Sequence, residues 1–316
     1  MTEVAITPRT FREVPGEHQE LLRRSGLTPR FPSVDRPLDE SEMEDLVRGC
    51  WGLIVGVDPV TATVMDAGAL RVVVKFGSGT DNIDMEAARN RGVRVEVTAG
   101  ANARSVAELT IGLLLAVARH VTFHDRVLRR GDWTRRTGME LAGRLLGVVG
   151  YGAVGSEVAR LARGIGMRVM AHDPLVTEAE VPMADLSTLL GTSDAVTLHV
   201  PFQEETRGLI GPAELALMQP HALLVNTSRG GIVDERALAE ALSSGRLGGA
   251  AIDTFAEEPP RGSPLLNLDN FVGSPHAGAA TLEAARRTGM AAVELLLAAA
   301  REVDEPEKRP GRGAGG

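Results

Sequence analysis

Cysteine is nearly absent from this chain, since Cys50 is the single one among 316 residues. A disulfide within the chain is therefore excluded, and one cysteine fits a reducing compartment. The chain also lacks the apolar core of a signal peptide, because charged residues occur throughout residues 1–30. The longest apolar stretch, residues 111–118, is too short to cross a bilayer. We therefore expect a cytoplasmic protein with no membrane partner.

An excess of positive charge is missing as well. The formal net charge is −8, with 34 Lys and Arg against 42 Asp and Glu. No basic stripe is available to displace counterions from a phosphate backbone, so a nucleic-acid partner is not expected. The chain is 43% hydrophobic and 24% charged, and 316 residues are enough for two globular domains.

The most informative stretch is a glycine-rich turn that follows an apolar run. Residues 145–149 lead into the pattern GxGxxG at Gly150, Gly152 and Gly155, and a helical pattern follows. In a dinucleotide fold these glycines allow the tight turn, the approach of a pyrophosphate, and close helix packing. The N–H groups of the first helical turn attract the phosphates. The motif alone is a weak signal in a chain with 36 glycines, but its flanking strand and helix favour dinucleotide binding over a plain turn.

An acidic residue completes this pattern. A second apolar run, residues 168–172, ends at Asp173, 18 residues after Gly155. The Asp173 carboxylate can accept a hydrogen bond from a ribose hydroxyl. It would repel a 2′-phosphate, and no arginine follows it directly, so the pattern predicts NAD rather than NADP as the cofactor.

Strand and helix patterns alternate along most of the chain and predict an α/β fold with parallel sheets. The further strands that we expect are residues 4–7, 53–57, 71–76, 93–97, 195–200, 223–226, 249–252 and 271–272. The longest helices that we expect are residues 102–130, as one unbroken helix, and residues 282–300. Nearly continuous apolar runs are typical of parallel strands that are covered on both faces.

Three segments that follow predicted strands carry side chains suited to acid–base chemistry: Arg229, Glu258 and His276. Reduction of a 2-oxo acid needs a cation to hold the carboxylate and polarise the carbonyl, and a general acid that works near neutral pH. A carboxylate should orient that acid. Each residue alone has an ordinary alternative as a turn residue, a surface acid or a strand-end cap. Together, at the strand ends of a sheet with a cofactor motif, they favour a catalytic set.

The chain resembles the D-2-hydroxyacid dehydrogenase family of the phosphoglycerate dehydrogenase type, in a short form without a regulatory domain. The segments that carry the resemblance are residues 76–84, 102–108, 131–133, 150–155, 199–201, 226–231, 253–260 and 274–278. The family implies two Rossmann-like doubly wound parallel-sheet domains with a cleft between them. The expected substrate domain, flavodoxin-like, comprises residues 1–101 and 282–316, with residues 304–316 disordered, and residues 102–281 form the NAD-binding domain.

The resemblance implies roles for individual residues. Arg229 would clamp the substrate carboxylate, Glu258 would orient His276 as the acid/base, and Asp253 would hold the nicotinamide carboxamide. The cofactor-binding residues that it implies are Gly150, Tyr151, Gly152, Ala153, Val154, Gly155, Asp173, His199, Val200, Pro201, Thr206, Thr227, Ser228, Asp253, His276 and Gly278. The substrate-binding residues are Lys75, Phe76, Gly77, Ser78, Gly79, Arg104, Arg229 and His276.

Two basic residues bear on the substrate. Lys75 could bind a phosphate or phosphonate as a point charge, or could simply end a strand, and Arg104 is a second candidate anion contact. On these two residues rests the expectation of a substrate with an extra anionic group, such as 3-phosphoglycerate and phosphohydroxypyruvate, or phosphonopyruvate.

The expected activity is hydride transfer between NAD and C2 of a small 2-oxo or D-2-hydroxy acid, in a homodimer as the family implies. No metal site is expected, because His120 and His124 lie one helical turn apart with no third ligand nearby in the sequence. Two alternatives stay open on the same fold: an NAD-sensing scaffold or corepressor, and a dehydrogenase of the phosphite type.

Overall fold

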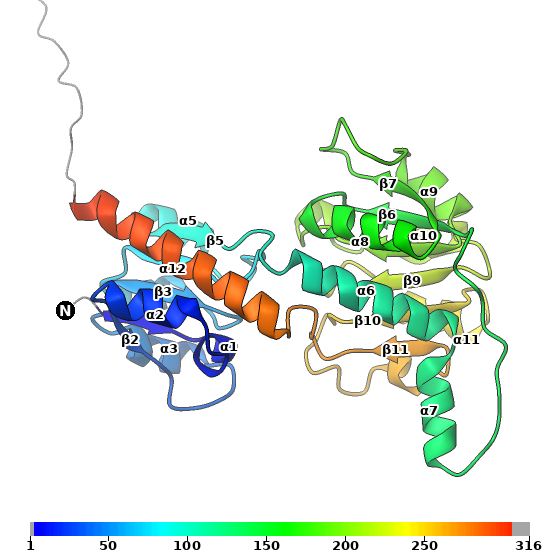
Figure 1. The fold of residues 1–316 in the computed structure, drawn as a ribbon, viewed down its shortest axis with the longest axis horizontal. Coiled ribbons are helices and arrows are strands. Elements are labelled where there is room, and N and C mark those ends of the chain that lie inside the picture. Colours follow the sequence, from blue (N-terminus) through cyan, green and yellow to red (C-terminus); the bar gives the residue numbers. More distant parts are fainter. Residues whose placement is uncertain (1–2, 305–316) are drawn as a thin grey trace, which may run out of the picture. The chain divides into compact units, whose positions relative to one another are not determined.

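The computed structural model describes residues 3–304 and divides into two compact units. Unit 1 comprises Met1–Ala101 with Thr281–Gly316, and unit 2 comprises Asn102–Ala280. Each unit holds one parallel sheet with helices packed on it (Figure 1). Apart from Asp304, the last residue of the final helix, the tail expected to be disordered lies outside the described residues.

Unit 1 is built on a five-stranded parallel sheet in the order β2-β1-β3-β4-β5. This is the flavodoxin-like order expected for the unit. Every residue of β3 and β4 is buried, as expected for central strands that are covered on both faces. The strands are β1 (Glu3–Ile6), β2 (Thr28–Arg30), β3 (Gly52–Val55), β4 (Val72–Lys75) and β5 (Arg94–Val97).

The last helix of the chain completes the core of unit 1. It is α12 (Leu282–Asp304), which packs against α2 and β4 and buries Ala292, Val293 and Leu296 completely (Figure 1). The other helices of the unit are α1 (Arg9–Glu13), α2 (Glu17–Arg24), α3 (Glu40–Val47), α4 (Ala62–Ala67) and α5 (Met85–Asn90).

Unit 2 is built on a six-stranded parallel sheet in the order β11-β10-β9-β8-β6-β7. A parallel bridge between Ala171 and Met183 adds a short further pairing beyond β7. With that bridge counted, the strands follow the dinucleotide-binding order, which reverses between β6 and β8. The strands are β6 (Leu145–Val149), β7 (Arg168–His172), β8 (Ala195–Leu198), β9 (Leu223–Asn226), β10 (Gly249–Ile252) and β11 (Phe271–Gly273).

The prediction of a single unbroken helix over residues 102–130 is wrong. The structure has two helices, α6 (Ala103–Ala118) and α7 (Val121–Arg129), separated at His120, whose φ of 52° is left-handed. The returning chain explains the break, because the amide of Met139 donates to the Ala118 carbonyl at 2.8 Å. The remaining α-helices are α8 (Ala153–Gly164), α9 (Leu186–Thr192), α10 (Pro212–Leu217) and α11 (Glu235–Ser243).

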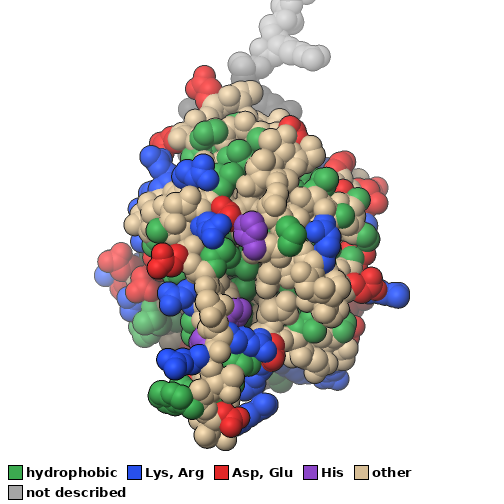
Figure 2. All heavy atoms as spheres, turned by 90° about the vertical axis from the view of Figure 1, so that its right-hand side faces the viewer, with side chains coloured by type: hydrophobic (Ala, Val, Ile, Leu, Met, Phe, Trp, Pro, Cys, Tyr) green, Lys and Arg blue, Asp and Glu red, His purple; other side chains and the backbone are tan. Residues whose placement is uncertain are grey.

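Within residues 3–304, no single helix has both the length and the apolar composition to cross a membrane. Only α6 and α7 taken together meet that criterion, as a pair bent by 65°. On the face of the molecule drawn in Figure 2, positive and negative side chains are intermixed with hydrophobic ones.

Candidate active site

The glycine-rich turn lies between β6 and α8, where the strand order of unit 2 reverses. A Cβ on Gly155 would lie 1.9 Å from the Gly150 carbonyl oxygen, and a Cβ on Gly150 would lie 2.6 Å from the His199 carbonyl oxygen. A Cβ on Gly152 would meet nothing within 4 Å. Two of the glycines thus permit close packing, and the third leaves space beside the N-terminus of α8, which fits a dinucleotide phosphate.

Asp173 anchors this turn to the end of β7. Its carboxylate accepts hydrogen bonds from the amides of Tyr151 at 2.8 Å and Leu175 at 2.9 Å. Because each carboxylate oxygen has more than one acceptor site, Asp173 retains the capacity to bind a ribose hydroxyl. The residues present therefore fit an NAD-type cofactor, and the role of Asp173 in preferring NAD to NADP stays a prediction.

Glu258 and His276 form a hydrogen-bonded pair. Nδ1 of His276 lies 2.9 Å from Oε2 of Glu258, so the ionised carboxylate accepts from the Nδ1–H tautomer. The other oxygen of Glu258 accepts from the amide of Phe255 at 3.0 Å. About two-fifths of each paired side chain is exposed, and Nε2 of His276 has no hydrogen-bond partner within residues 3–304. The pair therefore presents Nε2 as the atom that can carry a proton to a ligand.

The pKa of Glu258 lies below its ordinary value. Burial raises this pKa and is the largest single influence, but the hydrogen bond and charge of His276, the Phe255 amide and the charge of Arg229 together lower it further. Glu258 therefore remains ionised at neutral pH, as the partner of an imidazolium should. Arg229 follows β9, and its Nη1 donates to the carbonyl of Ser228 at 2.8 Å. Unit 2 thus brings together the three residues that the sequence predicted as a catalytic set.

Asp253 holds the turn that carries His276. Its buried carboxylate accepts from the amides of Ala277 at 2.8 Å and Gly278 at 2.9 Å, and its carbonyl accepts from the His276 amide at 2.8 Å. His276 has a left-handed φ of 54°, which is uncommon outside glycine. These bonds give Asp253 a structural task, and its expected contact with a nicotinamide carboxamide stays a prediction.

Asn226, the last residue of β9, is a contributor that the sequence interpretation missed. Its buried side chain accepts from the Ser228 amide at 3.0 Å and donates to the Arg229 carbonyl at 2.8 Å. This is an Asx-type turn that fixes the backbone on both sides of Arg229. The sequence did contain the signal, since an asparagine at a strand end before a short polar segment is typical of such a turn.

His199 follows β8, and its imidazole is enclosed. Neither ring nitrogen has a hydrogen-bond partner among the described residues, and burial lowers the pKa of His199 to about 3. The ring is therefore neutral at physiological pH, and the predicted contact of His199 with the cofactor stays a prediction. Beyond it, the Thr206 hydroxyl donates to the Pro201 carbonyl at 2.6 Å and accepts from the Gln203 amide at 2.8 Å, which closes the turn after β8.

Lys75, expected as a contact for an anionic tail, is buried within unit 1. Its ammonium donates to the Gly56 carbonyl and to Oδ1 of Asn82 at 2.6 Å, and Asn82 in turn donates to the Asp58 carbonyl. Lys75 therefore ties the turn after β3 to the loop after β4. Its binding of a substrate anion stays a prediction, but the structure gives the ammonium another use.

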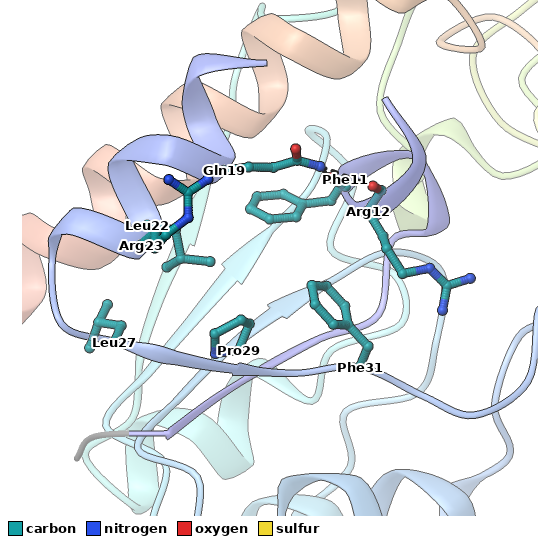
Figure 3. Close-up of a pocket in the computed structure, with 8 residues that line it drawn as sticks. All are labelled: Phe11, Arg12, Gln19, Leu22, Arg23, Leu27, Pro29 and Phe31. Carbon is teal, nitrogen blue, oxygen red and sulfur yellow. Dashed lines mark hydrogen bonds between the residues drawn. The ribbon is translucent and has the colours of Figure 1, made fainter. Parts of the chain in front are cut away.

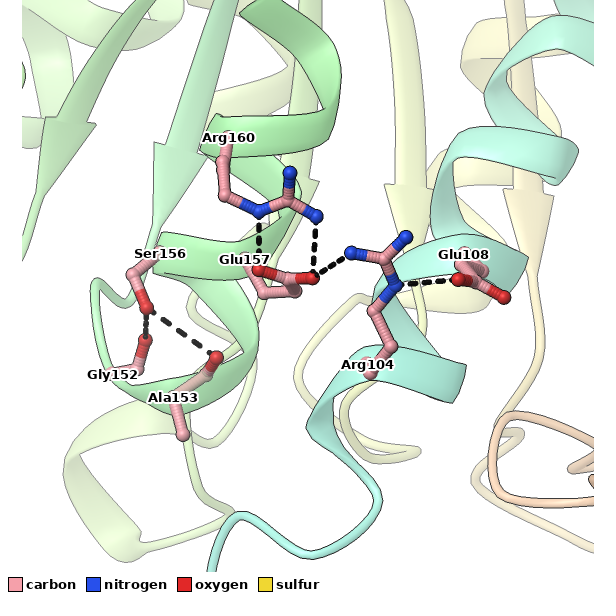
Figure 4. Close-up of polar contacts among 7 residues, drawn as sticks. All are labelled: Arg104, Glu108, Gly152, Ala153, Ser156, Glu157 and Arg160. Carbon is pink, nitrogen blue, oxygen red and sulfur yellow. Dashed lines mark hydrogen bonds and ion pairs between the residues drawn. The ribbon is translucent and has the colours of Figure 1, made fainter. Parts of the chain in front are cut away.

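Arg104, the second expected anion contact, lies between two carboxylates (Figure 4). Its guanidinium pairs with Glu108 on α6 and, at 2.6 Å, with Glu157 on α8. Arg160 holds the same Glu157 in two hydrogen bonds of 2.8 Å. The hydrogen bond from Arg160, opposed by burial and assisted by Arg104, lowers the pKa of Glu157 to about 2. The guanidinium of Arg104 thus joins two helices of unit 2.

A cavity of about 290 Å³ opens in unit 1 beside α2 and β2 (Figure 3). Apolar side chains form most of its wall, and its two arginines, Arg12 and Arg23, pair with Asp35 and Glu20. None of the predicted site residues lines this cavity, so it is separate from the chemistry predicted from the sequence.

Comparison with known proteins decides the family. The model for the NAD binding domain of the D-isomer specific 2-hydroxyacid dehydrogenases matches residues 111–278. A hydroxypyruvate reductase of Thermotoga maritima is 42% identical over 269 residues, which cover 82% of this chain and 88% of the relative. The chain belongs to the D-isomer specific 2-hydroxyacid dehydrogenase family. The expected oxidoreductase class, the NAD-type cofactor and the fold are thereby confirmed.

Other members of the family differ in length and in name. A glyoxylate reductase of Korarchaeum cryptofilum is 39% identical over 278 residues, which cover 84% of each chain. A D-3-phosphoglycerate dehydrogenase of Methanocaldococcus jannaschii is 39% identical over 269 residues, which cover 82% of this chain but 51% of the relative. A crystal structure of a Thermus thermophilus protein matches with a TM-score of 0.87 and 38% identity over 95% of this chain and 97% of that chain.

Proposed function

We propose that the protein reduces a small 2-oxo acid without a second anionic group, such as hydroxypyruvate or glyoxylate, with NADH. The observation that carries this choice is the internal pairing of both candidate anion contacts. Lys75 is 7% exposed and bonds within unit 1, and Arg104 is shared by two carboxylates. Binding a phosphate at either residue would require breaking those contacts. The smaller acids are also named in relatives of which the chain covers more than four-fifths.

In this proposal the residues of unit 2 divide the work. Arg229, with its backbone fixed by Asn226, holds the substrate carboxylate and polarises the carbonyl. His276 gives a proton from Nε2 to the carbonyl oxygen, while Glu258 keeps hold of Nδ1–H and stabilises the imidazolium. The nicotinamide, when bound, supplies the hydride that goes to C2. The roles predicted for the backbone at Gly77, Ser78 and Gly79, and for Phe76, are retained as predictions.

The test is a panel of substrates followed by NADH consumption. Hydroxypyruvate and glyoxylate should give kcat/KM values at least about tenfold above those of phosphohydroxypyruvate and phosphonopyruvate. The phosphate or phosphonate group adds negative charge that, in this proposal, no residue of the site binds. Pyruvate, whose only charge is its carboxylate, serves as the control of similar size without a second anionic group. In the reverse direction, D-glycerate should be oxidised and L-glycerate should not. A preference for the phosphorylated acid would overturn the substrate proposal, and no turnover of any acid would favour a scaffold role.

We further propose a homodimer, as predicted from the family. Three large apolar side chains stand exposed on and just after α7: Val121 at 52%, Leu128 at 55% and Trp133 at 80%. An exposed apolar group of this kind favours an interface. Light scattering should give about twice the mass of one chain, and Trp133→Glu should lower it toward a monomer.

A further inference from the structure

Two glutamates hold one turn of the candidate active site. The turn, residues 255–258, follows β10 and carries Glu258 at its end. The Phe255 amide donates to Glu258 itself at 3.0 Å, and the next amide, of Ala256, donates to Oε1 of Glu235 at 2.6 Å. Glu235 is the first residue of α11, so the second support comes from a different element of unit 2.

The same peptide unit touches the segment that carries Arg229. A Cβ on Gly230 would lie 2.0 Å from the Phe255 carbonyl oxygen and 2.5 Å from the Ala256 nitrogen. The peptide between Phe255 and Ala256 therefore lies directly against the backbone next to Arg229, with its N–H held by Glu235. A shift of this peptide would move Glu258 relative to Arg229 and His276 together.

We propose that Glu235 is a positioning residue of the dehydrogenase, which acts through the Ala256 amide to hold Glu258 in register with His276 and Arg229. This inference rests on the proposed roles of those three residues. Glu235 does not touch the reacting atoms. Its carboxylate accepts from a backbone donor of the turn at 2.6 Å, and a charge-assisted hydrogen bond of this length is among the stronger ones in proteins.

The ordinary alternative is that Glu235 only stabilises the N-terminus of α11. An acid in the first turn of a helix does favour the helix dipole. The cap of α11, however, is Asp234, whose side chain accepts from the amides of Arg236 at 3.0 Å and Ala237 at 3.0 Å. Removal of the Glu235 carboxylate therefore leaves the helix cap intact, so a variant at this position is expected to fold.

The test compares Glu235→Ala with Glu235→Gln, whose amide oxygen can still accept from Ala256. Glu240→Ala is the matched control, because Glu240 lies on the same helix and its carboxylate makes an exposed pair with Arg236 at 3.3 Å. Glu235→Ala should lower kcat about tenfold, because a small displacement of catalytic groups costs rate, while KM for NADH changes less than about twofold. Glu235→Gln should recover most of the rate, and Glu240→Ala should behave as the wild type.

Nitrogen-15 NMR of the imidazoles gives a readout that needs no substrate. The His276 signals, assigned by their loss in His276→Asn, should move in Glu235→Ala toward the values seen in Glu258→Gln, and should stay near wild type in Glu235→Gln and Glu240→Ala. Unmoved His276 signals with an unchanged kcat would overturn the positioning role. A wild type that turns over none of the acids, with His276 signals that do respond, would instead overturn the proposed function and leave the Glu235 contact supported.

Discussion

The strand ends of the two units use charged side chains in different ways. In unit 1, Asp58 follows β3 and Lys75 ends β4, and both residues are more than nine-tenths buried. Lys75 bonds to Gly56 and Asn82, and Asp58 accepts from the Leu38 amide. In unit 2, Glu258 and His276 are about two-fifths exposed, and within residues 3–304 the Nε2 of His276 has no partner.

This contrast separates a charge that stabilises a loop from a charge that is available for chemistry. Both kinds follow parallel strands, where ligands bind in such folds. In unit 1 Lys75 and Asp58 form hydrogen bonds with the backbone and with neighbouring side chains. In unit 2 the Phe255 amide orients the Glu258 carboxylate, which in turn holds Nδ1 of His276. Nε2 of His276 is left for a ligand. A position after a strand is thus not sufficient for a site, and the partners of each side chain decide its use.

The largest effect is expected from the outward-facing atom of unit 2. His276→Asn should lower kcat for 2-oxo acid reduction by about a thousandfold, because the general acid is lost. The Kd for NADH, measured by fluorescence quenching of the intact protein, should change little. Full turnover in this variant would remove His276 from the mechanism and erase the distinction drawn between the two units.

A somewhat smaller effect is expected at Arg229. Arg229→Lys keeps a positive charge but loses the planar fork that binds a carboxylate with two parallel hydrogen bonds. The value of kcat/KM for the 2-oxo acid should fall about a hundredfold, since the carboxylate is held in the ground state and the transition state. Thermal unfolding should show whether the fold is kept. Equal kinetics in Arg229→Lys and wild type would show that no bidentate clamp operates.

The interior lysine of unit 1 tests the other side of the comparison. Lys75→Met removes the donor to Gly56 and Asn82 and leaves buried acceptors unsatisfied, so the free energy of unfolding should fall by about 2 kcal/mol. The ratio of kcat/KM for hydroxypyruvate to that for phosphohydroxypyruvate should not change. Arg71→Met, at an exposed residue just before β4, is the control. A selective loss of activity on the phosphorylated acid, without destabilisation, would make Lys75 a substrate contact.

Local patterns in the sequence were enough to predict the α/β fold. The glycine turn between β6 and α8, and several strands with their bounds, such as residues 145–149 and 223–226, are confirmed by the structure. These features depend on neighbours along the chain, and so does the choice of Arg229, Glu258 and His276, since each follows a strand.

What the sequence could not predict depends on contacts between distant segments. The single long helix over residues 102–130 failed because Met139, from the returning chain, bonds to Ala118 at the point of the break. The partners of Lys75 and Arg104 come from other elements, and no local pattern indicates them. Whether a charged side chain is available to a ligand therefore depends on contacts between distant segments and not on the local sequence.

The smallest effect is expected at the carboxylate that joins α6 and α8 in unit 2. The pKa of Glu157 in the folded protein is about 2, below the ordinary value of a glutamate, so its contribution to stability is complete above about pH 4.5 and is lost as the pH falls toward 2. Glu157→Gln should therefore be less stable than wild type at pH 7 by about 1 kcal/mol or less, as expected for a partly exposed ion pair. Urea unfolding should show that this difference in the free energy of unfolding narrows below pH 4.5.

Glu240→Gln, on an exposed pair, is the control. A difference that persisted unchanged at pH 3 would mean that Arg104 is not held by the charge of Glu157, and Arg104 would again become a candidate for binding a substrate anion.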